Sequence, residues 1–167
     1  MLGRIVIEIL MLWVCYAIYM VILVHGRGPI GGSFFYPKAV QVRVIEMGLM
    51  TEQELKSRRR MAFALLCALM LLIPGIMVLL INGARGYWDC CWQFYALFLG
   101  AELFDWLVID TLWVALSDWW LIPCTEDLID TWDYVHVKQW KMVKLIVAGI
   151  PLAVLVGGLY WGIGLML

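Results

Sequence analysis

Three carboxylates stand in one apolar segment of this chain. Within residues 92–111 they are Glu102, Asp105 and Asp110, and no lysine or arginine accompanies them in that segment. An ionised acid at the centre of a bilayer costs about 2.5–3.5 kcal/mol even on the lenient insertion scale, so acids at such positions usually mark a functional site. The segment therefore predicts a site for a proton, a cation or a polar substrate.

The three acids fit within one side of a helix. At about 100° per residue, Glu102 and Asp105 lie about 60° apart and about one turn apart in height, and Asp110 lies about 80° from Glu102. Asp105 and Asp110 lie about 140° apart on a straight α-helix, too far for one metal ion unless a second helix contributes. An alternative interpretation is that the acids are protonated and form hydrogen bonds between helices.

A second polar group follows, between Glu126 and His136. The segment between them predicts an amphipathic helix at the membrane surface, because its apolar residues recur at helical spacing. Those residues are Leu128, Ile129, Trp132 and Val135. Carboxylates and an imidazole can also form a divalent-metal site or an acid–base pair, so Glu126 and His136 beside Asp110 are an alternative site.

Part of the sequence resembles a pattern in small multi-pass bacterial membrane proteins of unknown activity. The matching runs are Leu103-Phe104-Asp105 with Asp110, Ile122-Pro123-Cys124-Thr125-Glu126, and Tyr134-Val135-His136. The resemblance covers the last two predicted spans and the loop between them. It implies no particular activity, but it implies that these residues form one constellation.

The composition places these residues in a membrane. Of 167 residues, 65% are hydrophobic and 15% are charged, and the mean hydropathy is +0.91. Soluble domains are roughly 45–50% apolar and about 25% charged, and a soluble chain of this size could not bury so much apolar surface. The composition excludes a disordered chain, a nucleic-acid-binding domain and a soluble enzyme. The odd number of cysteines, five, argues against a disulfide framework.

Four segments are long and apolar enough to span a bilayer, which takes about 20 residues of helix. They cover about residues 5–24, 61–81, 92–116 and 142–167. The predicted fold is an all-α integral membrane protein, one membrane domain over residues 1–167. Loops 25–60 and 117–141 are predicted to carry amphipathic interfacial helices, the first of them around Val40, Val44 and Ile45.

The basic residues predict the orientation. Ten of the twelve lie in or beside the two long loops, and Arg4 and Arg85 alone lie on the other side. By the positive-inside rule both loops are cytoplasmic and both termini lie outside the cell membrane. Arg58, Arg59 and Arg60 directly precede the second span and are expected to contact anionic lipid headgroups, each contributing about 1 kcal/mol.

Further features concern helix packing. Pro74 predicts a kink in the second span. Gly158 and Gly162 form a G-x-x-x-G pair, which predicts close helix packing and a homo-oligomer. Arg4 and Glu8, four residues apart, predict a local ion pair.

Three functions remain open on the sequence. The first is proton- or cation-coupled transport through the site at Glu102, Asp105 and Asp110. The second is a membrane-embedded enzyme that acts on a lipid or isoprenoid at its cytoplasmic face. Its acid–base groups, or its ligands for a divalent cation as cofactor, would be Asp105, Asp110, Glu126 and His136. The third is a subunit or assembly factor whose acids pair with basic residues of another membrane protein.

Overall fold

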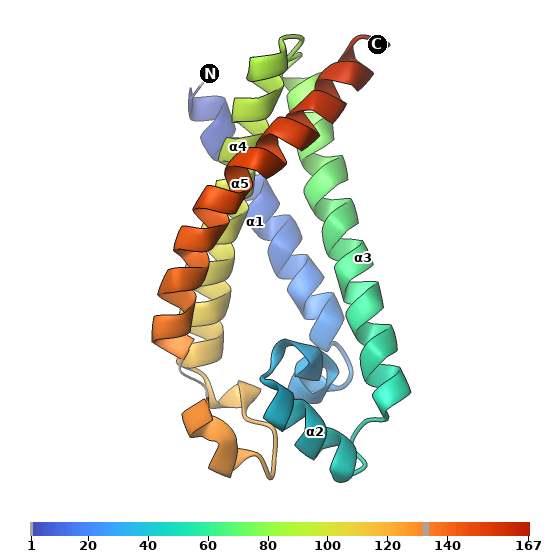
Figure 1. The fold of residues 1–167 in the computed structure, drawn as a ribbon, viewed down its shortest axis with the longest axis vertical. Helices are drawn as coiled ribbons and strands as arrows, with labels where there is room; N and C mark the ends of the chain where they lie inside the picture. Colours follow the sequence, from blue (N-terminus) through green and yellow to red (C-terminus); the bar gives the residue numbers. More distant parts are fainter. Residues whose placement is uncertain (1, 132–133) are drawn as a thin grey trace.

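The computed structural model describes residues 2–131 and 134–167. It is 84% helical, and the described residues form no strand, which confirms the all-α prediction. The long helices run side by side along one axis, and both termini lie at the same end of the bundle (Figure 1).

Three helical stretches are long and apolar enough to cross a membrane. They are Gly3–Val24 in α1 (Leu2–Val24), Glu52–Ile81 in α3 (Glu52–Ile76) with η2 (Met77–Ile81), and Met142–Gly164 in α5 (Tyr134–Gly164). At most a third of the most apolar window of each stretch is buried inside the protein. Their remaining apolar surface faces outward, which is compatible with a membrane location.

The segment after the predicted kink residue, Pro74, changes its helical form. Proline has no backbone N–H to donate, so the regular α-helical ladder loses a bond at this point. Helix α3 continues beyond Pro74 and widens into the π-helical turn η2 at Met77. The ring of Tyr160 packs against Gly75, where an added Cβ would lie 3.2 Å from the ring.

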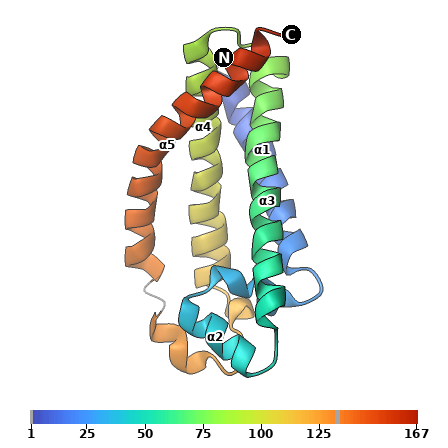
Figure 2. The same cartoon turned by 45° about the vertical axis from the view of Figure 1, so that its right-hand side comes forward.

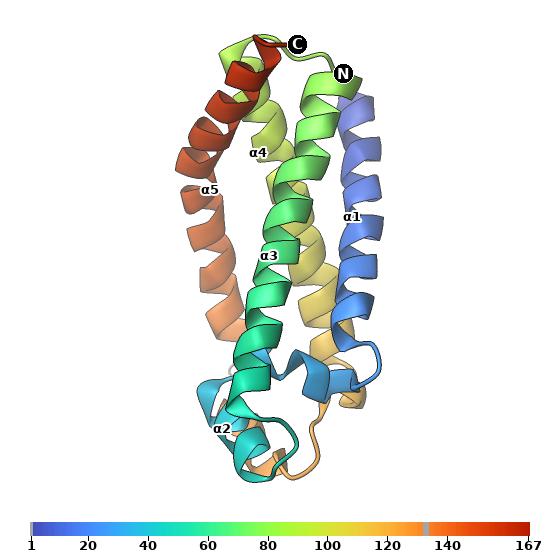
Figure 3. The same cartoon turned by 90° about the vertical axis from the view of Figure 1, so that its right-hand side faces the viewer.

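The predicted third span, residues 92–116, forms α4 (Tyr87–Phe104) and the π-helical segment η3 (Asp105–Ala115). Together they run between the other helices, with α1 and α5 on opposite sides (Figure 3). This segment is not among the three stretches that are apolar enough to cross a membrane, so four spans are not confirmed. The physical reason is its polar content, from Gln93 to Asp110.

The two long connections lie together at the end of the bundle opposite the termini (Figure 2). We call residues 25–60 and 117–131 the loop end. It contains η1 (Gly28–Phe35), α2 (Lys38–Glu46), η4 (Asp118–Trp120) and η5 (Glu126–Thr131).

The apolar side of α2 is covered by protein. Val40 and Val44 are fully buried, in a core cluster that includes Tyr36, Trp120 and Ile122. The hydroxyl of Tyr36 donates to the carbonyl oxygen of Trp120 at 2.6 Å, which ties the two connections together. The prediction of an interfacial helix at this position is therefore not confirmed, because the face expected to contact lipid packs inside the loop end.

Candidate functional site

The three predicted site residues lie on one continuous helical segment and near one side chain of α1. Glu102 lies near the end of α4, and Asp105 and Asp110 lie in η3; all three are half-buried. Each carboxylate acts electrostatically on Tyr16, a buried residue of α1, and Asp105 does so most strongly. Their role as one site for a proton, a cation or a polar substrate stays a prediction.

The π-helical form of η3 changes the relation between Asp105 and Asp110. In a π-helix the backbone hydrogen bonds join residues five apart, so these residues become neighbours on successive turns. The hydroxyl of Thr111 donates to the carbonyl of Trp106 at 2.7 Å, across the same five-residue interval. The angle of about 140° expected between Asp105 and Asp110 applies to a straight α-helix, whereas this segment is π-helical.

Two phenol groups of α1 belong to this region and were not predicted from the sequence. Tyr16 and Tyr19 are 9% and 6% exposed, and their ring centroids lie 5.7 Å apart. The hydroxyl of Tyr19 donates to the carbonyl of Ala62 on α3 at 3.0 Å, whereas the Tyr16 ring packs against Phe104 at 6.0 Å. The signal in the sequence was weak, because tyrosines in an apolar helix also serve as interface anchors.

The alternative site at Glu126 and His136 is described only in part. Glu126 is exposed, and its Oε1 accepts a hydrogen bond from the backbone N–H of Cys124 at 3.1 Å. The backbone of His136 lies in α5, but its side chain is outside the described residues. Across the described part of the chain, no group of three or more His, Cys, Asp or Glu residues could hold a metal ion.

The three arginines before the apolar part of α3 differ in their contacts. Arg58 lies 3.5 Å from Glu54, which also pairs with Arg27 at 2.9 Å. Arg59 donates to the side-chain oxygen of Gln41 at 2.7 Å, and Arg60 is exposed. Contact of these arginines with lipid headgroups stays a prediction.

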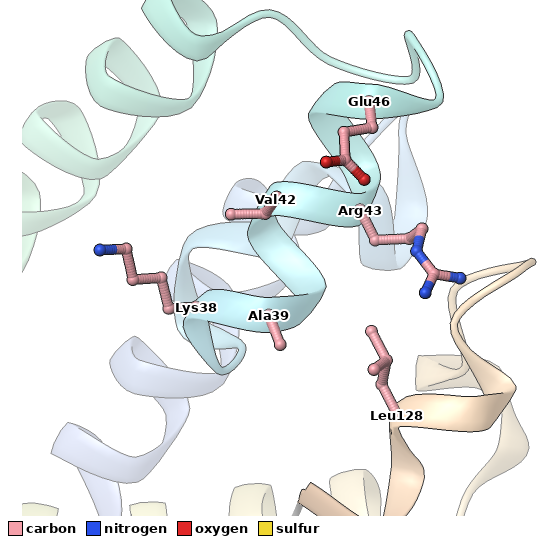
Figure 4. Close-up of a pocket in the computed structure, with 6 residues that line it drawn as sticks. All are labelled: Lys38, Ala39, Val42, Arg43, Glu46 and Leu128. Atoms are coloured by element: carbon pink, nitrogen blue, oxygen red, sulfur yellow. The ribbon is translucent and has the colours of Figure 1, made fainter.

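A shallow groove of about 430 Å³ opens between α2 and η5 (Figure 4). Its apolar surface comes from Ala39, Val42 and Leu128, and its charged rim comes from Lys38, Arg43 and Glu46. The guanidinium of Arg43 also pairs with Asp127 at 3.1 Å, so this rim residue joins the two connections.

The glycines of α5 serve mainly to pack this helix against α4. An added Cβ at Gly157 would lie 2.6 Å from the backbone of Cys91, and one at Gly149 would lie 2.9 Å from Phe98. Of the G-x-x-x-G pair, Gly158 faces Tyr87 at 3.4 Å, whereas Gly162 has nothing within 4 Å among the described residues. Gly162 is therefore the member of the pair that stays open to another helix.

Comparison of the chain with models of protein families, with curated proteins and with solved structures finds no match. The function proposed below is accordingly argued from the chain's own residues.

Proposed function

We propose that the chain is a four-span membrane protein in which α4 and η3 form the remaining span. The segment from Tyr87 to Ala115 runs beside the three apolar helices along the bundle (Figure 1). Its polar side chains are tolerable in a bilayer when neighbouring helices surround them. The termini lie at one end and the long connections, which hold most of the basic residues, at the other, in agreement with cytoplasmic loops and extracytoplasmic termini.

We propose further that the protein binds and carries a proton or small cation at Glu102, Asp105 and Asp110. The observation that supports this is that all three carboxylates lie on one helical segment and each interacts electrostatically with Tyr16 of α1. Carboxylates gathered at bilayer depth repel one another, and each must be neutralised by a proton or paired with a positive charge. A phenol hydroxyl can donate to one carboxylate while a cation or proton occupies another, so the region favours exchange of a single positive charge.

A second copy of the chain would complete the path of the proton or cation across the membrane. Four helices enclose little space, and the proposed homo-oligomer forms through the face of α5 that carries Gly162. A Gly162→Leu variant tests this point, since it blocks close helix approach. Fluorescence resonance energy transfer between labelled copies in vesicles is expected to fall in Gly162→Leu. If the transfer is unchanged, the proposed oligomer through this face is wrong.

The proposed function is tested by ion flux into reconstituted vesicles. Purified protein is placed in liposomes that contain a pH-sensitive dye, and a potassium diffusion potential drives proton entry; parallel vesicles report the entry of sodium, potassium or magnesium. The wild-type protein is expected to raise one of these fluxes. Asp105→Asn should reduce that flux to the level of protein-free vesicles, and Asp105→Glu should restore part of it.

A matched control lies on the same helical segment. Asp89 is exposed on α4, where it accepts a hydrogen bond from Trp92 at 3.3 Å, and Asp89→Asn keeps that acceptor. This variant should retain the wild-type flux. If the wild-type protein conducts none of these ions faster than empty vesicles do, the transport proposal is wrong.

A further inference from the structure

A second polar cluster lies at the end of the bundle that holds the termini. Three segments distant in sequence each contribute one side chain to it: Glu8 from α1, Asn82 directly after η2, and Gln93 from α4. The amide nitrogen of Asn82 donates to Glu8 Oε2 and to Gln93 Oε1, both at 3.0 Å. Glu8 and Gln93 are 3% and 4% exposed, and Asn82 between them is half-buried.

The other oxygen of the Glu8 carboxylate has no donor. Glu8 Oε1 is buried and accepts no hydrogen bond from any described residue. The predicted Arg4–Glu8 ion pair is not formed. Arg4 instead donates to Asn82 Oδ1 at 3.4 Å and to the carbonyl of Ile81 at 3.3 Å.

The other charged groups of the neighbouring segments are also engaged elsewhere. Arg85 donates to the carbonyls of Leu79 and Ala84, both at 3.2 Å. Asp89 of α4 is exposed and binds Trp92. The part of α5 after Lys144 contains no charged residue. None of these side chains supplies a positive charge to Glu8 Oε1 in the described structure.

The surroundings of Glu8 favour a positive ligand. A carboxylate oxygen buried without a donor is costly, and buried charges are normally paired or bound to an ion. The C-terminal end of α3 and η2 points into this region, and the carbonyls at a helix C-terminus carry partial negative charge. The contacts of the Ile81 and Leu79 carbonyls with two guanidinium groups show that this end already attracts cations.

We propose that Glu8, Asn82 and Gln93 form a binding site for one small monovalent cation, a proton or an alkali-metal ion, at Glu8 Oε1. This site is separate from the carboxylates near Tyr16. Leu12 of α1 and Leu97 of α4, both 0% exposed, lie between the two along the same pair of helices. The site therefore does not depend on the function proposed above.

Thermal unfolding of the detergent-purified protein tests this site. One series lowers the pH in choline chloride, and another adds sodium, potassium or lithium chloride at fixed pH and ionic strength. A ligand present at about a hundredfold above its dissociation constant should raise the melting temperature by about 5–10 °C. Glu8→Gln should abolish the rise in one series, because an amide is nearly the same size but binds neither a proton nor a cation well.

Asp89→Asn, which removes an exposed carboxylate at the same end of the bundle, should keep the full response. Infrared spectra provide a second measurement, which does not depend on thermal unfolding. A bound proton gives the carbonyl band of a protonated acid that is absent from Glu8→Gln, whereas a bound alkali ion shifts the carboxylate bands on titration. If neither pH nor any of the three ions gives a response that depends on Glu8, the proposed site does not exist.

Discussion

The indole nitrogen of Trp13 donates a hydrogen bond to the carbonyl oxygen of Gly100 at 2.9 Å. This contact fixes the register between α1 and α4, which run in the same direction through the bundle (Figure 1). In this register Tyr16 packs against Phe104, and Glu8 and Gln93 both accept a hydrogen bond from Asn82. Gly100 makes the contact possible, since an added Cβ there would lie 2.7 Å from the side chain of Ile9.

Gly100→Ala should weaken the α1–α4 interface. The Ile9 side chain or the helix axis must move to admit the methyl group, and overpacking of this kind typically costs about 1–3 kcal/mol. The measurement is thermal unfolding in detergent, with loss of helical circular dichroism as the signal. Gly3→Ala is the control, because nothing lies within 4 Å of its added Cβ, and it should not lower stability. Equal effects of the two variants would contradict the packing described here.

Tyr16→Phe should reduce ion flux while leaving the fold intact. The variant removes the hydroxyl on which the three carboxylates act but keeps the ring that packs against Phe104. The proposed function has this hydroxyl donate to one carboxylate, and a hydrogen bond to a charged group contributes about 1.5–3 kcal/mol, so the flux should fall about tenfold or more.

Tyr19→Phe gives the matched control for the loss of a hydroxyl. Its hydroxyl donates to the carbonyl of Ala62, so the variant should lose about 1 kcal/mol of stability and keep its flux. Vesicle flux and thermal unfolding measured on both variants separate the two roles. A larger loss of flux in Tyr19→Phe than in Tyr16→Phe would contradict the assignment.

The π-helical form of η3 predicts which pairs of introduced cysteines can bind one metal ion. In a background without the five native cysteines, Asp105→Cys with Asp110→Cys should bind cadmium, because residues five apart are neighbours in a π-helix. Asp105→Cys with Val108→Cys should not, although residues three apart are neighbours in an α-helix. Ultraviolet absorption of the cadmium–thiolate bond measures binding. The opposite preference would show that residues 105–115 form an ordinary α-helix.

The sequence predicted those features that depend on composition and local periodicity. Long apolar runs form helices wherever they meet lipid or one another, so α1, α3 and α5 followed directly from residue type. The acids of α4 and η3 were recognisable as a candidate site because their charge is costly in such a segment. The positions of these acids around the helix axis were not predictable, because no pattern of residue types marks the change from α- to π-helix at Asp105.

Other features depend on how distant segments pack. Glu8, Asn82 and Gln93 meet only because α1, η2 and α4 converge, and the sequence showed Glu8 only with its near neighbour Arg4. The apolar face of α2 was visible as a pattern around Val40 and Val44. Such a pattern identifies a face that must be covered, but it does not say whether lipid or protein covers it.

Cys124 offers a test of the turn that joins η4 to η5. Its φ of +66° is a left-handed conformation, which costs a residue with a side chain about 1–2 kcal/mol. The turn is held by Thr125, whose hydroxyl donates to the carbonyl of Ile122 at 2.7 Å, and by Arg43, which donates to the Cys124 carbonyl at 3.2 Å. Because these contacts use backbone or neighbouring atoms and the Cys124 side chain is exposed, Cys124→Gly relieves the strain without removing them.

Cys124→Gly should therefore raise stability by about 0.5–1 kcal/mol, after the greater flexibility of glycine in the unfolded chain is taken into account. For a protein of this size that corresponds to a melting temperature about 1–4 °C higher. Cys124→Ser keeps the strained backbone and should give no gain. Gly48 has a φ of +71° and nothing within 4 Å of an added Cβ, so it allows the reverse substitution. Gly48→Ala places a side chain on left-handed backbone and should lower stability by a similar amount. Equal melting temperatures for Cys124→Gly and Cys124→Ser would mean that the left-handed backbone at this turn stores no appreciable strain.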